Sequence, residues 1–337
     1  MTSAGGHVLA LVALAVLLVL LGGCGAAGSE QRAGLLRVDV PLQEPVWVPG
    51  KEVLLALSED RRRVVRVNVA ESSPGARTPT RSVEFEDVGE NLALSPEEPE
   101  LAYLPRPESG RVSALGTDSL RVVDSFDVGD SPTDVTLDVQ SEVLFALSKD
   151  GSTVSGVGIE IPEEIPTVGV GGDARTLLEA PEKGLDPAFW IAGPGGVAFY
   201  GGDPPERMVW RPMEAQDIAV DLTSSQLTYI AEADRVVALE GDPEHLLEGN
   251  LEVMATRNLG EKVERLASDE LHVFAATQDR LVAMRRETLE PVESVAFGPV
   301  LGREGVRPAN FSGMTVGAED VYLTLEGEPS VLSVKRP

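Results

Sequence analysis

A pair of strand-like segments recurs seven times along this chain at a nearly constant interval. The first segment of each pair is a short apolar run, and a polar turn separates it from the second. Successive first segments begin 48, 42, 45, 39, 45 and 49 residues apart. Their first residues are Leu54, Ala102, Leu144, Phe189, Thr228, Val273 and Tyr322. Strand pairs at regular spacing with intervening turn residues predict one repeated all-β architecture.

Each repeat has room for two further strands. Outer strands are expected after the hairpins, as in Leu120–Phe126, Arg207–Arg211 and Pro291–Phe297. Inner strands are expected before the next hairpins, as in Asn91–Leu94, Asp134–Leu137, Asp217–Val220 and Glu264–Ala267. Four strands in about 45 residues are typical of a propeller blade, and no amphipathic helical stretch of useful length competes with them. The sequence therefore predicts an all-β fold, a seven-bladed β-propeller of four-stranded blades.

The two ends of the repeat array predict how the ring closes. The seventh repeat has no outer strand, because the sequence reaches Pro337 directly after the partner strand at 331–334. A spare strand, Leu35–Val40, stands at the other end of the array. Pairing this strand with the seventh blade would remove an open sheet edge. We therefore expect residues 35–337 to form the propeller, whereas a stack of sandwich domains would leave no single spare strand.

The third repeat carries a specific resemblance. Val128–Asp138 contains a Val-Gly start followed by Pro132, and the turn Ser148–Val154 contains Asp150 and Gly151. These residues resemble the YVTN-type repeat of lactonase-like propellers, whereas the other six repeats keep only the strand rhythm. The resemblance supports the propeller architecture. It also implies an alternative function, a lactonase-like or other metal-assisted hydrolase with its site at the central channel.

The N-terminal segment predicts where the protein works. Val8–Leu21 is an unbroken apolar run that ends in Leu21, Gly22, Gly23 and Cys24. This segment resembles the signal peptide and lipobox of bacterial lipoproteins. The resemblance implies that residues 1–23 are cleaved and that the Cys24 thiol carries a diacylglyceryl group with fatty-acyl chains such as palmitate. It also implies a location outside the cytoplasm, anchored to the cell membrane, with residues 24–34 as a flexible tether.

Other interpretations of this segment fit less well. A transmembrane helix needs about 20 apolar residues to span the hydrocarbon core. Val8–Leu21 has only 14 residues and stops at two glycines, which is the length of a signal-peptide core. No Lys or Arg precedes Val8. Cleavage without lipidation and an uncleaved anchor therefore remain the alternatives.

Composition limits the partners that such a protein could bind. The net charge of −27 argues against nucleic acid and against adhesion to anionic lipid, because both are polyanions. The same charge would attract cations or basic partners. Cys24 is the only cysteine, so its acylation would leave no disulfide. We expect a monomer whose partner, besides the membrane, is an envelope protein or a small-molecule ligand.

Few residues in the chain could carry catalysis. Only three histidines are present, which is too few for a His-rich metal site, and no G-x-S-x-G or Walker sequence occurs. The Gly-rich segment Gly169–Ala174 is expected to be a loop between blades, because Pro166 precedes it and a strand-like segment follows. Arg61, Arg62 and Arg63 are expected at a solvated hairpin tip, offsetting Glu59 and Asp60.

One set of polar residues recurs at the start of the inner strands. Aligning the repeats places six side chains near one mouth of the central channel, with Gly313 at the seventh position. They are Glu44, Asn91, Asp134, Arg175, Asp217 and Glu264. Oxygen ligands of this kind suit Ca²⁺ or Mg²⁺. The alternative is that inner strands simply begin with polar residues because the channel is wet, and this alternative is preferred because Arg175 and Gly313 break the ligand set.

The sequence thus favours a lipid-anchored, extracytoplasmic binding or scaffold module without a cofactor. A hydrolase that uses a divalent cation such as Ca²⁺ at the channel mouth is the alternative. Fold alone does not decide between them, since propellers carry many unrelated functions.

Overall fold

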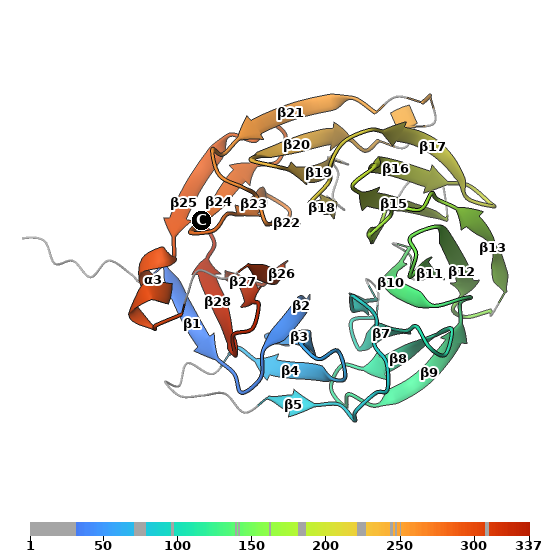
Figure 1. Ribbon diagram of the computed structural model, residues 1–337, viewed down its shortest axis with the longest axis horizontal. Helices are drawn as coiled ribbons and strands as arrows, with labels where there is room; N and C mark the ends of the chain where they lie inside the picture. The colour runs from blue at the N-terminus through green and yellow to red at the C-terminus, as the bar shows by residue number, and fades with distance from the viewer. Residues whose placement is uncertain are drawn as a thin grey trace, which may run out of the picture. The chain divides into compact units, whose positions relative to one another are not determined.

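The computed structural model describes residues 32–70, 79–95, 98–138, 140, 142–161, 163–180, 187–220, 227–242, 245–246, 248–249, 251–306 and 310–337. The predicted signal peptide, Leu21, Gly22, Gly23 and Cys24 lie outside these residues. Within them, the strands form seven four-stranded antiparallel sheets arranged as the blades of a ring (Figure 1). The predicted seven-bladed β-propeller is therefore confirmed.

The strands of a blade follow one another from the channel outward. Blade 1 contains β2 (Leu42–Val48), β3 (Val53–Ser58), β4 (Val64–Asn68) and β5 (Thr80–Arg81). Blade 2 contains β6 (Ala93–Leu94), β7 (Leu101–Arg106), β8 (Arg111–Gly116) and β9 (Val122–Asp127). Blade 3 contains β10 (Pro132–Leu137), β11 (Val143–Ser148), β12 (Thr153–Gly158) and β13 (Glu164–Gly169).

The remaining blades follow the same order. Blade 4 contains β14 (Thr176–Glu179), β15 (Ala188–Gly193), β16 (Gly196–Gly201) and β17 (Glu206–Arg211). Blade 5 contains β18 (Asp217–Val220), β19 (Leu227–Glu232), β20 (Arg235–Glu240) and β21 (Val253–Asn258). Blade 6 contains β22 (Arg265–Ser268), β23 (His272–Ala276), β24 (Arg280–Arg285) and β25 (Pro291–Ala296). Blade 7 contains β26 (Phe311–Val316), β27 (Asp320–Leu325), β28 (Ser330–Lys335) and, as its outermost strand, β1 (Ala33–Arg37).

The seventh blade closes with the N-terminal strand, as predicted, but the strand begins earlier along the chain. Strand β1 pairs with β28 from Ala33 opposite Val334 to Arg37 opposite Ser330. Val38 leaves the sheet, is buried, and packs with side chains of blade 1 in the core. The predicted bounds Leu35–Val40 are therefore wrong at both ends: the last valines fill a core, whereas Ala33 and Gly34 belong to the strand and not to the tether.

The hydrophobic core is divided into seven clusters, one at each boundary between neighbouring blades. Side chains on a strand point alternately to opposite faces of its sheet. Along β3, Leu54 and Ala56 accordingly face blade 7, while Val53, Leu55 and Leu57 face blade 2. This two-sided burial explains why the second strand of each blade reads as a continuous apolar run.

Aromatic pairs also join neighbouring blades. Phe145 of blade 3 contacts Phe189 of blade 4 with ring centroids 4.9 Å apart. Trp47 of blade 1 stacks on Tyr322 of blade 7 at 5.7 Å, which reinforces the boundary where the ring closes. Such contacts contribute beyond the apolar area that they bury.

One element was not expected from the sequence. The short helix α3 (Gly298–Arg303) follows β25, begins with Pro299 in its first turn, and buries Val300 and Leu301. It packs beside β1 at the outer side of blade 7 (Figure 1). No helix among the described residues is long and apolar enough to cross a membrane.

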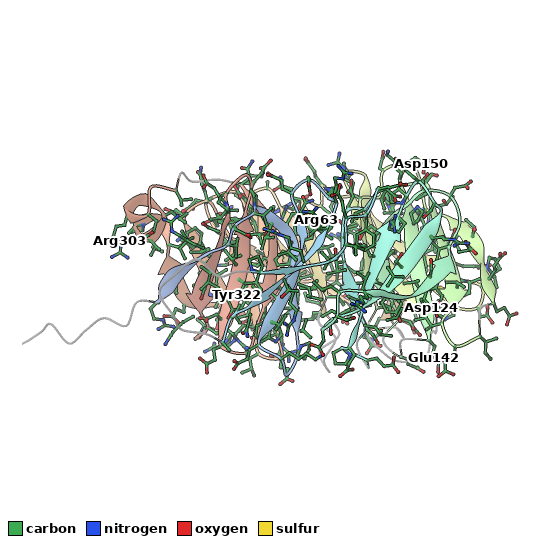
Figure 2. All side chains as sticks on the ribbon, turned by 90° about the horizontal axis from the view of Figure 1, so that it is seen from below. Arg63, Asp124, Glu142, Asp150, Arg303 and Tyr322 are labelled. Carbon is green, nitrogen blue, oxygen red and sulfur yellow. The ribbon has the colours of Figure 1, made fainter. Side chains whose placement is uncertain are left out.

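The ring has two rims. Figure 2 places Asp150, in the turn between β11 and β12, at one rim and Glu142, before β11, at the other. We call these the turn rim and the opposite rim. The innermost strands begin at the turn rim, since Asp134 of β10 pairs with Leu147 at the end of β11.

Candidate functional site

Residues within or directly before all seven innermost strands line a central cavity of about 410 Å³. Five of the six predicted channel residues lie in its wall: Glu44, Asn91, Asp134, Arg175 and Asp217. Glu264 lines a neighbouring cavity of about 390 Å³, between blades 6, 7 and 1 at the turn rim. Glu44 and Arg265 line both cavities. The structure thus brings five members of the set to one cavity and the sixth to the cavity beside it.

Three of the four acidic members of this set join neighbouring blades. The Leu177 N–H of blade 4 donates to the Asp134 carboxylate at 2.8 Å. In the same way, the Leu266 N–H of blade 6 donates to Asp217 at 2.6 Å. We call this contact an interblade clamp: a side chain at the start of one innermost strand accepts a hydrogen bond from the backbone of the next. Hydrogen bonds from N–H groups to a buried carboxylate are among the stronger ones in proteins.

Two further residues form related clamps. Asn91 accepts from the Val135 N–H at 2.9 Å and donates its amide to the Val135 carbonyl at 2.7 Å, which joins blades 2 and 3. Glu264 accepts from the Phe311 N–H at 3.2 Å and so joins blades 6 and 7. Four of the predicted ligands thus already have backbone partners on the neighbouring blade. Arg175 cannot accept a hydrogen bond, so it forms no clamp of this kind.

Glu44 differs from the other channel residues in its backbone. It lies where the pairing of β2 with β3 shifts register between Gln43 and Val46, and its φ is +47°. The shifted strand approaches Gly313 of blade 7 closely: a Cβ at Gly313 would meet Pro45 Cδ at 2.4 Å and Glu44 Cα at 2.9 Å. Only glycine therefore fits at the seventh position of the set.

Burial controls the charge of the channel carboxyls. It raises the pKa of Glu44 to about 7, and the nearby Arg265 guanidinium partly opposes this rise. It raises the pKa of Asp217 to about 6, against the opposing effects of Arg265 and the Leu266 N–H. The pKa of Asp134 is also raised by burial, well above its ordinary value. Since a low-polarity environment disfavours the charged form, these acids bind protons at higher pH than exposed ones.

A further, half-buried acid lies at the other end of an innermost strand. Glu179, the last residue of β14, accepts a hydrogen bond from the Thr136 hydroxyl at 3.1 Å, and burial raises its pKa. Sequence reasoning missed Glu179 and Arg265, because neither stands at the repeated position. The only sequence signal for these two residues is that a charged side chain occurs within an innermost strand.

The channel does not assemble a metal-ligating group. Among the residues that the structure describes, no three His, Cys, Asp or Glu side chains are placed to hold one ion together. Two histidines fall in the described ranges and they lie on different blades: His245 is near Glu240 of blade 5 and His272 near Asp269 of blade 6. Asn91, Asp134, Asp217 and Glu264 accept hydrogen bonds from the neighbouring strands.

The other sequence features lie outside the channel. The Gly-rich segment is the loop from β13 to β14, as expected, so it has a strand on each side and no helix. The arginine turn reaches solvent, and after the Ser58 hydroxyl the charges of Arg62 and Arg63 help to lower the pKa of Asp60, in line with the expected offset. No ion pair among the described residues joins the turn to Glu59 or Asp60. Arg62 and Arg63 instead pair with Glu84 at 2.6 Å and 2.8 Å, and Arg61 pairs with Glu90 at 3.4 Å.

Comparison with known proteins identifies the fold only. No protein-family model matches the chain, and no curated protein matches it in sequence. A solved structure described as U3-55K superimposes with a TM-score of 0.68 at 10% identity, over 90% of this chain and 98% of the other. The WD40 repeats of RRP9 superimpose with a TM-score of 0.68 at 10% identity, over 91% and 98% of the two chains. The chain shares the propeller fold of WD40 repeats. At this identity the likeness carries no function.

Proposed function

We propose that this protein is a lipid-anchored, extracytoplasmic binding module in which the propeller is a rigid scaffold held at the envelope by Cys24. The support for the location is the apolar run Val8–Leu21 followed by Gly22, Gly23 and Cys24, the pattern of a lipoprotein signal. A diacylglyceryl group with a further acyl chain supplies the membrane anchor. The body, with a charge of −27, supplies no attraction to anionic lipid.

One observation supports a scaffold over a hydrolase: three of the four acidic groups at the channel mouth serve as interblade clamps. Asp134, Asp217 and Glu264 each accept a backbone N–H of the next blade. Each of these bonds holds the next blade in place, because losing the acceptor would leave the donor N–H without a partner, at a cost of about 1–3 kcal/mol for a buried group. The clamps therefore favour a rigid ring that presents its surface to a partner.

The anchor is tested by substituting Cys24 with Ala and following the protein through membrane fractionation. We expect the wild-type chain in the membrane pellet after a high-salt wash, and labelled by an alkyne analogue of palmitate. Cys24→Ala should be unlabelled and should leave the pellet. Gly25→Ala, next to the modified residue, is the matched control and should behave as the wild type. A Cys24→Ala variant that stays in the washed pellet would contradict the lipid anchor.

The binding role is tested on the lipidated chain solubilised from membranes. A scaffold should purify with an envelope protein in constant stoichiometry and should not hydrolyse lactone or ester substrates. Purification of the chain alone together with substrate turnover, abolished by Asp217→Asn, would favour the hydrolase.

A further inference from the structure

A groove at the opposite rim differs in character from both cavities at the turn rim. It has a volume of about 630 Å³ and is lined by residues of blades 3 and 4. Its residues come from the start of β11, the loop from β12 to β13, and the connections that flank β15 and β16. Figure 2 shows Glu142, one of these residues, on the rim opposite Asp150. We call it the blade 3–4 groove.

The charge of the blade 3–4 groove has a single sign. Five carboxylates line it, and no Lys, Arg or His does: Glu142, Glu160, Glu163, Glu164 and Asp203. All five are exposed. In the described part of the chain none of them pairs with a cation, whereas the arginines of the turn rim are held by Glu84 and Glu90. The mutual repulsion of these five groups is therefore uncompensated within the described residues.

Apolar side chains also line the groove. Ile161 is 75% exposed, more than any other large hydrophobic side chain that the structure describes. Val143, Ile165, Pro166 and Pro187 line the groove around it. An exposed aliphatic side chain among apolar and charged neighbours is typical of a protein-interaction site.

The loop that carries Ile161 is held in place by backbone hydrogen bonds. The Ile159 N–H donates to the Glu142 carbonyl at 2.8 Å, and the Gly158 N–H donates to the Glu163 carbonyl at 3.1 Å. These bonds tie the loop to the start of β11 and across its own base. A loop that is fixed at its base loses less entropy when a partner binds.

We propose that the blade 3–4 groove binds a basic segment of a partner protein, with an aliphatic or aromatic side chain against Ile161 and Lys or Arg residues on either side of it. This inference rests on the proposed function, since it assigns the partner surface of the scaffold. Charge complementarity selects the occupant: opposite charges steer association and suppress acidic competitors. Ile161 and the apolar lining select a segment with an anchor side chain over a simple cation.

Other occupants fit the groove less well. An anionic membrane surface is repelled by the five carboxylates. A single metal ion needs at least three convergent ligands, and no such group exists among the described residues. A second copy of this chain would bring further negative charge, since the chain carries −27.

The test uses the full-length chain in detergent and a fluorescently labelled peptide in which lysine pairs flank one leucine. Two reference peptides accompany it: one with serine in place of leucine and one with glutamates in place of the lysines. Anisotropy titrations measure each affinity at low and at high salt. We expect saturable binding of the lysine–leucine peptide that weakens with salt, and no saturable binding of the glutamate peptide.

Two variants with matched controls locate the binding. Ile161→Ser should weaken the lysine–leucine peptide by about tenfold, because the anchor loses its apolar contact. The double variant Glu160→Gln/Glu164→Gln should weaken it by about fivefold and reduce its salt dependence. The controls lie on blade 6: Leu271→Ser, where the leucine is 67% exposed, and Glu270→Gln/Glu287→Gln. Both controls should bind as the wild type.

Several results would overturn the inference. The first is that the lysine–leucine peptide shows no saturable binding. The second is that the serine peptide binds as tightly as the lysine–leucine peptide. The third is that the blade 6 controls lose as much affinity as the groove variants do. Binding of Ca²⁺ at the groove with displacement of the peptide from all variants alike would assign the carboxylates to a cation instead. Each outcome is independent of whether Cys24→Ala leaves the membrane, so a failure of the groove and a failure of the lipid anchor can be distinguished.

Discussion

Replacing Glu44 with glutamine should stabilise the ring at alkaline pH and hardly affect it in mild acid. The folded protein raises the pKa of Glu44 from 4.5 to about 7 because the channel wall desolvates the carboxyl. The folded state therefore binds this proton more tightly than the unfolded chain does. The resulting stabilisation is fully present below about pH 4.5 and is lost as the pH rises through about 7. Above that pH the folded ring holds a poorly solvated charge.

The size of the effect follows from the shift. At about 1.4 kcal/mol per pKa unit, the rise in the pKa of Glu44 corresponds to about 3 kcal/mol of lost stability near pH 8. For a ring of roughly 300 residues, this equals about 5 °C in melting temperature. A glutamine side chain would keep the shape of the glutamate and remain neutral at every pH. Glu44→Gln should therefore melt about 5 °C higher near pH 8 and within about 1 °C of the wild type near pH 5.

Thermal unfolding followed by circular dichroism at the two pH values measures this difference. Glu287→Gln is the control, because Glu287 is exposed on the turn after β24 and should give no pH-dependent change. A Glu44→Gln variant that is destabilised equally at both pH values would refute the reasoning. That result would mean that the Glu44 carboxylate makes a specific contact whose loss outweighs its desolvation.

Three further predictions concern the clamps, the closure and metal binding. Asp134→Ala should lower the melting temperature by roughly 2–5 °C near pH 7, because the buried Leu177 N–H loses its acceptor. The control Asp124→Ala, on the exposed strand β9, should change the melting temperature little. Deleting Ala33–Arg37 should cause aggregation in light-scattering assays, since β28 loses its outer partner strand. Glu304→Gln removes only the exposed ion pair to Arg37 and should leave the chain monodisperse. Added Ca²⁺ should raise the melting temperature no more than NaCl of equal ionic strength; a saturable rise that disappears in Asp217→Asn would reveal a cation site at the channel.

The fold was predictable because its signal is local and repeated seven times. The second strand of each blade is buried on both faces, so its apolar run stands out in the sequence, and Tyr322 begins such a run as clearly as Leu54 does. The strand bounds at the closing edge were less predictable. Ala33 and Gly34 have weak strand preferences and join β1 only because β28 offers its open edge. Pairing with a strand at the far end of the chain leaves no local trace.

The partners of the channel residues could not be predicted for a related reason. Asp134 and Leu177 are separated by 43 residues, and Asp217 and Leu266 by 49, which is about one repeat in each case. Sequence shows a polar residue at a repeated position but not whether it faces a ligand or the next blade. Whether such a residue faces a ligand or the next blade depends on which backbone N–H groups of the next innermost strand lie within its reach.

The departures from the repeat are explained by the same geometry. At the boundary between blades 7 and 1, Pro45, the residue after Glu44, has no N–H to donate. A side chain at Gly313 would collide with Pro45 and Glu44. This boundary is held differently, by the Ser312 hydroxyl donating to the Leu42 carbonyl at 2.8 Å and the Trp47 N–H donating to the Thr315 hydroxyl at 3.2 Å. Gly313 and Pro45 thus depart from the pattern together. Glu44, which lies beside them, is the channel acid whose substitution by glutamine should relieve desolvation without breaking a contact between blades.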